Sequence, residues 1–306
     1  MYSDIAQGSV IGPLLFILFV NDLAKIVHAA TCKLVADDVK LYSSVDLDET
    51  VLSVALDKLV VWSNDWQLCI NTSKTKVLYL GLHNQHVVYR INNIEILHSD
   101  HVRDLGVELD ENFNFNFHVN NIIKSAYQRL AILFRGFSSR DPTVLTLAYK
   151  VYVRPILEHC SEIWSPYLLK HINVLENVQR FFTRKIGNLK VYEYADRLFI
   201  LNLESLEIRR LKKDLIMYYK IIHGLIDLNM NEFFLIDNDM YTRGHNFKIC
   251  KPPCKSDLFS NSFANRVINC WNLLPSTVVN MNSIKGFSAK LDSINFDKFI
   301  KGRALV

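Results

Sequence analysis

The acidic pair Asp37-Asp38 is the first place in the chain where residue type and spacing indicate chemistry. It stands between two short strand-like runs, residues 32–36 and 39–42, a pattern typical of a β-hairpin. Two-residue hairpin turns prefer Asn-Gly or Asp-Gly, so an Asp-Asp tip indicates that the carboxylates themselves are needed. Such a tip can offer oxygen ligands to Mg²⁺. The alternative interpretation is an ordinary acidic surface turn.

Histidines and cysteines offer a competing metal site. Two histidine doublets and one cysteine pair preceded by a histidine occur in the chain. Zinc sites usually combine doublets at defined spacing. Here the histidine doublets stand in the strand-rich part and the cysteines lie far away, so structural zinc is the weaker metal hypothesis. The residues are His83, His86, His98, His101, His245, Cys250 and Cys254.

The elements that must position these residues change along the chain. Residues 10–20 are apolar, with Pro13 where a first helical turn tolerates it, which predicts a short buried helix. This stretch is about half of the ~20 residues that a membrane span needs. Leucines and tryptophans at steps of three and four predict an amphipathic helix over 50–66, with the tryptophans in the core. Strand-like runs follow at 77–80, 87–91 and 102–109, and from 122 to 224 the period is helical.

Composition and charge limit the class of protein. Half of the 306 residues are hydrophobic and 22% are charged, which excludes wholesale disorder, and roughly 150 residues per domain predicts two domains. Scattered cysteines without a secretory signal indicate a reducing, intracellular setting. The net charge is −7 over residues 1–119, +8 over 120–225 and +3 over 226–306. An acidic segment followed by a basic one suits a protein that binds cations at one place and a polyanion at another. The alternative is chance variation between solvated helix faces.

Four short motifs stand in a fixed order in the first 110 residues. They are QGSVIGPLLF at 7–16, VADD at 35–38, Asn71 with Lys74-Thr75, and LGV at 105–107. Their order and spacing resemble motifs B, C, D and E of the reverse transcriptases of non-LTR (LINE-type) retrotransposons, in the jockey/CR1-like group of animals.

Three later signatures extend this resemblance over nearly the whole chain. They are similar to the segment that follows the polymerase in these elements. The signatures are VRPILE at 153–158 with WSP at 164–166, LESLE at 203–207 with Arg209-Arg210, and NRVIN at 265–269 with Trp271-Asn272 and Leu274-Pro275.

The resemblance implies an α+β fold in three parts. Residues 1–119 correspond to a partial right-hand polymerase palm, an antiparallel sheet with helices. Residues 120–225 correspond to a basic, mainly α-helical thumb-like region. Residues 226–306 correspond to the carboxyl-terminal region of the retrotransposon reading frame.

The resemblance also implies roles for individual residues. Motif B lines the pocket for the template base and the incoming deoxynucleotide, here Gln7, Gly8 and Ser9, which would otherwise be an ordinary loop before a helix. Asp37 and, less strongly, Asp38 would hold the catalytic Mg²⁺ pair. Lys74 resembles a lysine that is a candidate proton donor to pyrophosphate, although by spacing alone it is a surface lysine.

Two further sets of residues would contact nucleic acid. Residues of the LGV motif resemble the primer grip, and basic residues of the thumb-like region would contact the phosphate backbone. The first set is Leu105, Gly106 and Val107. The second set is Arg209, Arg210, Lys212 and Lys213.

The sequence departs from the family pattern in three ways. Ala6 stands where proline is usual, and Val35 stands where an aromatic residue is usual. The aspartate of motif A lies upstream of motif B in the family, and here six residues precede Gln7. Adjacent strand residues point to opposite faces, so the acidic pair needs a carboxylate from another strand. We therefore expect the carboxyl-terminal half of a polymerase, with an incomplete two-ion site.

Three functions fit these observations. The first is an RNA-directed DNA polymerase fragment for an RNA template, a DNA primer, dNTPs and Mg²⁺, inactive as it stands. The second is a non-catalytic fragment that binds RNA or an RNA/DNA hybrid, and the third is the non-functional product of a decayed element. The expected location is the nucleus or cytoplasm, without secretion or a membrane, and association with an intact element-encoded protein is one option.

Overall fold

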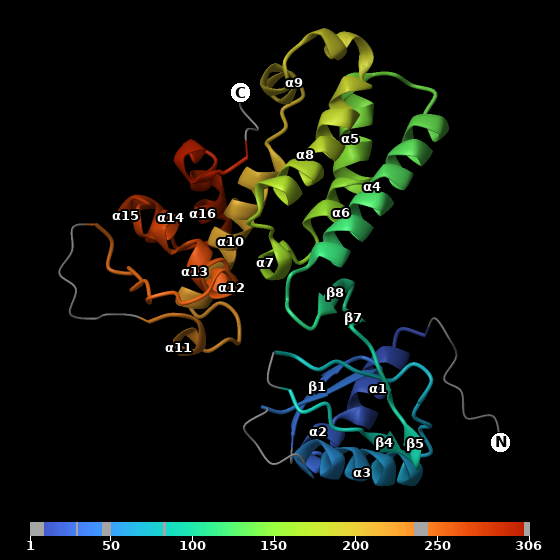
Figure 1. Ribbon diagram of the computed structural model, residues 1–306. Coiled ribbons are helices and arrows are strands. Elements are labelled where there is room, and N and C mark those ends of the chain that lie inside the picture. Colours follow the sequence, from blue (N-terminus) through green and yellow to red (C-terminus); the bar gives the residue numbers. More distant parts are fainter. Residues whose placement is uncertain (1–8, 29, 45–49, 82–83, 236–243, 303–306) are drawn as a thin grey trace. The chain divides into compact units, whose positions relative to one another are not determined.

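The computed structural model describes residues 9–28, 30–44, 50–81, 84–235 and 244–302. The chain divides into two compact units. The first contains Met1–Arg103 and Leu109–Asn112, and the second contains Asp104–Glu108 and Phe113–Val306. Helices and strands both occur, so the predicted mixed fold class is confirmed at this level (Figure 1). A palm and a thumb stay predictions.

The first unit contains three helices and several short strands. The helices are α1 (Gly12–Val20), α2 (Leu23–Ile26) and α3 (Thr50–Asp65). The strands are β1 (Thr31–Val35), β2 (Asp38–Tyr42), β3 (Lys76–Val77), β4 (Arg90–Ile91), β5 (Ile94–Glu95) and β6 (Leu97–His98). β1 and β2 are antiparallel, as are β4 and β5, whereas β3 and β6 are parallel. Among the described residues these strands form separate two-stranded ladders rather than one larger sheet.

The predicted single strand over 102–109 is wrong. The segment is a hairpin of β7 (His101–Asp104) and β8 (Val107–Asp110). Leu105 and Gly106 have φ angles of 46° and 89°, the left-handed values that a tight two-residue hairpin turn requires. The strand-like run at 77–80 contributes one strand residue, Val77 of β3, and the run at 87–91 contributes two, Arg90 and Ile91 of β4.

The core of the first unit joins the amino-terminal helices to α3. Its buried residues are Val20, Leu23, Val27, Ala55, Leu59 and Trp62. The indole Nε1 of Trp62 donates a hydrogen bond to Asp22 Oδ1 at 3.0 Å, which fixes α3 against the start of α2. Trp62 therefore lies in the core, as predicted. Trp66 does not, because its side chain is 41% exposed beyond the end of the helix.

Helix α1 forms where the sequence predicts it, with Pro13 in its first turn, but it is not buried. Only Val20 is buried and Phe16 partly so, and these two residues lie on one face at a spacing of four. Leu14, Ile17 and Leu18 are more than half exposed. The helix is apolar on all sides while the unit covers one side, so an apolar surface is left in contact with water.

The second unit is almost entirely helical. Its longer helices are α4 (Asn116–Gly136), α5 (Pro142–Tyr152), α8 (Leu169–Arg184), α9 (Tyr194–Ile200), α10 (Leu206–Ile222) and α16 (Ile284–Leu291). Its short helices are α6 (Arg154–Glu158), α7 (Ser161–Trp164), α11 (Met230–Phe233), α12 (Asp257–Ser260), α13 (Phe263–Arg266), α14 (Ile268–Asn272) and α15 (Ser276–Val279). The helical period predicted for 122–224 is confirmed, beginning slightly earlier at Asn116. None of the helices within the described ranges is long and apolar enough to cross a membrane.

Side-chain caps start two of the long helices. The Asp141 carboxylate accepts hydrogen bonds from the backbone N–H groups of Thr143 (2.7 Å) and Val144 (3.1 Å), and these bonds lower the pKa of Asp141. The Ser205 hydroxyl accepts one from Ile208 N at 3.2 Å, at the start of α10. Short polar side chains therefore set the first residue of α5 and of α10.

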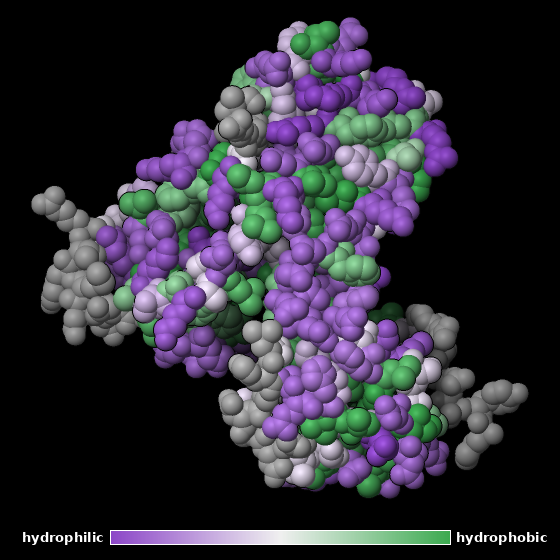
Figure 2. Space-filling model, in the orientation of Figure 1, coloured by the Kyte–Doolittle hydropathy of each residue, from purple (hydrophilic) through white to green (hydrophobic). Residues whose placement is uncertain are grey.

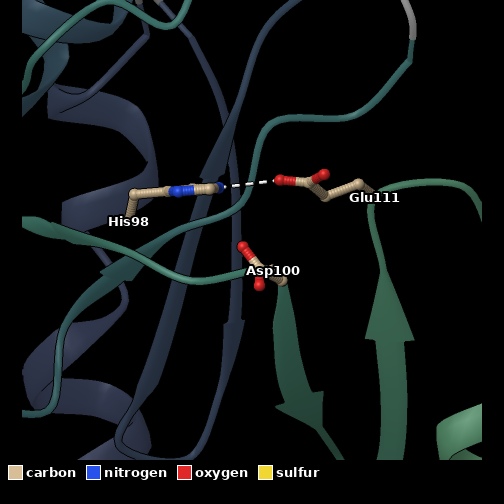
Figure 3. Close-up of side chains that lie close together, drawn as sticks. All are labelled: His98, Asp100 and Glu111. Carbon is tan, nitrogen blue, oxygen red and sulfur yellow. Dashed lines mark hydrogen bonds and ion pairs between the residues drawn. The ribbon is translucent and has the colours of Figure 1, made fainter.

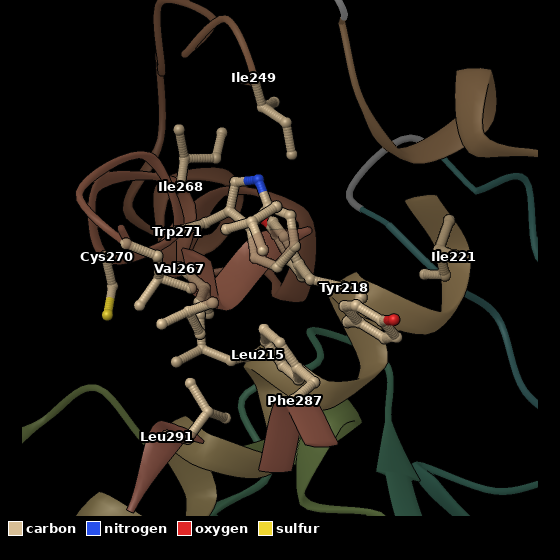
Figure 4. Packing of buried hydrophobic residues seen from close by; sticks show 14 of the residues in the cluster. Leu215, Tyr218, Ile221, Ile249, Val267, Ile268, Cys270, Trp271, Phe287 and Leu291 are labelled. Atoms are coloured by element: carbon tan, nitrogen blue, oxygen red, sulfur yellow. The ribbon is translucent and has the colours of Figure 1, made fainter. Parts of the chain in front are cut away.

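Helix α10 packs its apolar face against the carboxyl-terminal helices (Figure 4). Leu215 and Tyr218 contribute from α10, Trp271 from α14 and Phe287 from α16. The ring of Tyr219 stacks on Phe287 with centroids 4.4 Å apart. On the visible face of each unit the hydrophobic residues are interrupted by hydrophilic ones (Figure 2). The main apolar contacts of this unit are therefore internal.

The exposed side of α1 generates a prediction about association. Replacing Leu18, 65% exposed, with Gln should reduce self-association, because it removes apolar surface that excludes water when two chains meet. The free energy of unfolding should change by less than about 0.5 kcal/mol. Sedimentation velocity at several concentrations and urea unfolding measure the two effects.

Leu23→Gln is the matched control. Leu23 is 1% exposed in the core of the first unit, so the same change should cost roughly 2 to 5 kcal/mol of stability. If Leu18→Gln destabilised the chain as much as Leu23→Gln, α1 would have to be packed on both sides.

Candidate nucleic-acid and metal site

The β1–β2 hairpin positions the acidic pair. Its register runs from Thr31 opposite Tyr42 to Val35 opposite Asp38, so the two turn residues are Ala36 and Asp37. Ala36 has a φ of 52°, the left-handed value that the turn requires. The predicted Asp-Asp tip is therefore shifted by one residue. Asp37 lies in the turn, and Asp38 is the first residue of β2.

The hairpin has one face toward the core and one toward water. Leu34 and Leu41 pack against the core of the first unit. Asp38 lies opposite Val35, on the other face, because side chains alternate along a strand. Both carboxylates are exposed and accessible to a hydrated cation. Oxygen donors of this kind suit Mg²⁺, but among the described residues no third metal-ligating side chain completes a group with them.

Motif B is only partly described. Gln7 and Gly8 lie outside the described residues. Ser9 precedes α1, and its hydroxyl accepts a hydrogen bond from Ile11 N at 3.3 Å. This contact shapes the chain before the helix, and the template and nucleotide roles of the three residues stay predictions.

The motif that carries Lys74 is a turn built on Asn71. The Asn71 Oδ1 atom accepts hydrogen bonds from Lys74 N (3.2 Å) and from the Ser73 hydroxyl (2.7 Å). The Thr75 hydroxyl donates to the Asn71 carbonyl at 2.9 Å. An asparagine side chain bonded to its following backbone is typical of such turns. It leaves the Lys74 side chain exposed, and the proton-donor role stays a prediction.

The Leu105-Gly106-Val107 turn packs closely on α6 and α7. His159 Nε2 donates a hydrogen bond to the Leu105 carbonyl at 3.0 Å. A Cβ atom on Gly106 would lie 3.2 Å from the same nitrogen, and Val107 is 2% exposed. Glu108 N donates to His118 Nδ1 at 3.2 Å. The turn is thus held rigidly by two histidines, while the primer-grip role stays a prediction.

Three of the four basic residues of α10 have hydrogen-bond partners inside the second unit. Arg209 forms a bidentate pair with Glu158, through Nε–Oε1 and through Nη2–Oε2 at 3.0 Å. Lys213 Nζ donates to the Glu158 carbonyl at 2.6 Å. Lys212 contacts the carboxylate of Glu204. Carboxylates of the protein thus neutralise Arg209 and Lys212, where the sequence predicted a phosphate-binding surface.

Lys212 and Arg210 of α10 are both enclosed by the second unit. Lys212 Nζ also lies 2.6 Å from Asp292 Oδ1, which ties α10 to the end of α16. Arg210 is 1% exposed, and its three guanidinium nitrogens have no hydrogen-bond partner. Burial lowers its pKa, against the attraction of Glu176. Contact of these four side chains with a phosphate stays a prediction. Arg209, Lys212 and Lys213 contact acidic groups and a carbonyl of the protein, whereas Arg210 is buried without a hydrogen-bond partner.

A metal-ligating group that the sequence did not predict lies in the first unit (Figure 3). One ligand atom each of His98, Asp100 and Glu111 lies within 4.8 Å of the others. His98 Nε2 and Glu111 Oε1 are 2.8 Å apart. Imidazole nitrogen with carboxylate oxygen suits a divalent transition metal, although exposed groups of this kind also pair without one. The β7–β8 hairpin brings Glu111 back to His98, 13 residues earlier in the chain. The spacing of the residues in the sequence does not indicate this contact.

The predicted histidine and cysteine doublets do not form a zinc site in the described part of the chain. His83 lies outside the described residues. His86 and His98 both pack on the Tyr79 ring, with their own centroids 6.0 Å apart. His245 Nε2 donates to the Trp271 carbonyl at 3.1 Å, and burial lowers its pKa, so it is a structural residue. Cys250 and Cys254 are free thiols.

The turn at Gly106 generates a stability prediction. Gly106→Ala should lower the free energy of unfolding by roughly 1 to 3 kcal/mol, because alanine disfavours a φ of 89° and its Cβ would press on His159. Gly136→Ala is the control, since Gly136 ends α4 with open space around it and alanine favours a helix. Urea unfolding of both variants measures the difference. Equal free energies of unfolding for the Gly106→Ala and Gly136→Ala variants would show that the turn does not require glycine at position 106.

Comparison with known proteins finds a family match for the first third of the chain. Residues 2–109 match the family described as reverse transcriptase (RNA-dependent DNA polymerase). An uncharacterized protein of Caenorhabditis elegans is 29% identical over 126 residues, covering 40% of this chain and 64% of the relative. The RNA-directed DNA polymerase from mobile element jockey of Drosophila melanogaster is 23% identical over 207 residues, 62% of this chain and 22% of the relative.

Another mobile-element protein gives the same result. The probable RNA-directed DNA polymerase from transposon BS of Drosophila melanogaster is 27% identical over 224 residues, covering 68% of this chain and 25% of the relative. No solved structure matches. The chain thus spans about a quarter of the length of these mobile-element polymerases. The resemblance drawn from the four motifs is confirmed: residues 2–109 match the reverse transcriptase family, and the chain is similar to the RNA-directed DNA polymerases of LINE-type, jockey-like mobile elements.

Proposed function

We propose that this chain is a part of an RNA-directed DNA polymerase that presents Asp37 and Asp38 to a divalent metal ion. The observation that carries the proposal is the β1–β2 hairpin, which exposes both carboxylates within the segment that matches the family. Mg²⁺ held there would favour the ionised 3′ hydroxyl of a primer and neutralise pyrophosphate. The substrates would be an RNA template, a DNA primer and dNTPs.

The chain's own residues would bind and orient these substrates. Gln7, Gly8 and Ser9 would contact the template base and the nucleotide, and the exposed Lys74 would deliver a proton to the leaving group. Leu105, Gly106 and Val107 would support the primer through their rigid turn. These roles follow from the motif resemblance together with the exposure and rigidity described above.

The metal site in the described residues is incomplete for two ions. Asp37 and Asp38 lie on different parts of the hairpin, and two-metal chemistry needs carboxylates on at least two elements. We therefore propose that this chain by itself extends no primer. Association with an intact element-encoded protein is one way in which the missing ligand could be supplied.

A second surface supports nucleic-acid binding independently of the metal. Tyr127 of α4 and Phe181 of α8 meet edge to face with centroids 5.5 Å apart, and both are more than a third exposed. The ammonium of Lys185 lies 5.6 Å from the Phe181 ring centroid. Exposed aromatic rings beside basic side chains bind single strands by stacking on bases and pairing with phosphates. This surface favours the alternative function, a non-catalytic RNA or RNA/DNA-binding fragment.

Mn²⁺ binding tests the proposed metal site. Electron paramagnetic resonance should detect Mn²⁺ bound to the full chain, and Asp37→Asn with Asp38→Asn should weaken that binding at least fivefold. Asp57→Asn, an exposed aspartate of α3, is the matched control, and His98→Ala separates the second metal-ligating group. The same proteins should extend no primer on an RNA template with dNTPs.

Two results would contradict the proposal. Mn²⁺ binding that is unchanged in the double variant would remove Asp37 and Asp38 from the metal site. Primer extension by the chain that is lost with Asp37→Asn would show that another residue completes the two-ion site. An oligonucleotide that binds equally well to the wild type and to the double variant would favour the non-catalytic function.

A further inference from the structure

Helix α8 carries a row of polar residues along one face. Asn173, Asn177, Arg180 and Arg184 follow one another at steps of four, three and four, which places their side chains on the same side of the helix. Helix α9 packs against α8 (Figure 1). The row lines one wall of a pocket of about 480 Å³, and the other wall consists of Glu193, Tyr194 and Arg197.

Two of the three arginines of this pocket, Arg180 and Arg197, are held in place. Arg197 is 3% exposed, and it donates hydrogen bonds from Nε to the Thr183 hydroxyl (3.0 Å) and from Nη1 to the Tyr192 carbonyl (2.7 Å). The guanidinium groups of Arg180 and Arg197 lie 4.9 and 5.5 Å from the centroid of the Tyr194 ring. Arg180 and Arg197 therefore need little further ordering to bind a ligand, whereas the Arg184 side chain is exposed.

The Tyr194 ring is itself fixed from the buried side. Its hydroxyl donates to the Glu176 carboxylate and accepts from Gln179 Nε2 at 3.0 Å. Glu176 is thus turned away from the pocket, toward Tyr194 and the first N–H group of α10, that of Leu206. The acidic group that lines the pocket is Glu193.

The pocket holds an excess of positive charge. Three arginines face one glutamate. Burial lowers the pKa of Arg197, and the positive charges of Arg184 and Arg180 act in the same direction. Within the described residues the Arg184 guanidinium makes no hydrogen bond or ion pair, unlike that of Arg209 on α10. An anion bound between Arg184 and Arg197 would remove this repulsion.

We propose that this pocket binds a phosphate group of a nucleic-acid strand. Guanidinium groups match phosphate oxygens with paired, charge-assisted hydrogen bonds, and the amides of Asn173 and Asn177 supply further donors. The proposal rests on the nucleic-acid function proposed above and adds the site of one backbone contact. The same chemistry fits a free phosphate or pyrophosphate, so the test distinguishes these sources.

Binding of a 20-nucleotide single-stranded RNA to the full chain, followed by fluorescence anisotropy at several salt concentrations, tests the site. Arg184→Gln should weaken binding about tenfold and reduce the slope of log K against log salt by ~0.7, the loss of one phosphate contact on a single strand. Arg184→Lys should weaken it less. Arg129→Gln, an exposed arginine of α4 outside the pocket, should change the affinity less than twofold.

A second measurement identifies the source of the phosphate. If thermal unfolding shifts upward with sodium pyrophosphate in the wild type and not in Arg184→Gln, the pocket takes a terminal or free phosphate. If only the RNA affinity responds to Arg184→Gln, the ligand is a phosphodiester. Equal behaviour of Arg184→Gln and Arg129→Gln in both measurements would overturn the proposed site. A wild-type chain that binds no RNA would instead overturn the nucleic-acid function, while the pyrophosphate measurement would still test the pocket.

Discussion

The buried ion pairs of helix α10 hold the second unit together. Asp214 is 2% exposed and pairs with Arg266 of α13 at 2.7 Å. Burial raises the pKa of Asp214, and the positive charge of Arg266 offsets part of this rise. Arg209 joins the same helix to Glu158 of α6. Removing one partner of a buried pair leaves an uncompensated charge, which costs about 3 to 5 kcal/mol. The position of α10 therefore depends on these contacts as much as on its apolar face.

This arrangement changes what the basic segment means for function. A net charge of +8 over residues 120–225 indicates a polyanion-binding surface when the sequence is read alone. In the structure Arg209, Lys212 and Lys213 of α10 contact residues of neighbouring segments. Arg184, which has no ion-pair partner among the described residues, lies on α8. An excess of basic residues in a sequence can therefore be neutralised by acidic groups of the protein or by a ligand. Only the side-chain contacts in the structure distinguish these two cases.

Local pattern predicted the elements better than the contacts between them. The hairpin of residues 31–42 was predicted to within one residue, and the difference arises because Ala36 takes the left-handed turn position. Helix α1 was placed correctly, but its apolar sequence does not say how much of it the rest of the unit covers. The motif order predicted the family. The partners of Arg209, and the approach of Glu111 to His98, join residues distant in sequence and could not be predicted from spacing.

Arginine-selective modification with phenylglyoxal distinguishes the arginines that are held inside the protein from Arg184, which we propose contacts a ligand. Mass spectrometry of the modified full chain, with and without a single-stranded RNA, measures the reactivity of each arginine. We expect Arg184 to react rapidly and to be protected by RNA, and Arg209 and Arg210 to react slowly in both conditions. Rapid modification of Arg209 or Arg210 that RNA suppresses, with no protection of Arg184, would show instead that the arginines of α10 bind the nucleic acid.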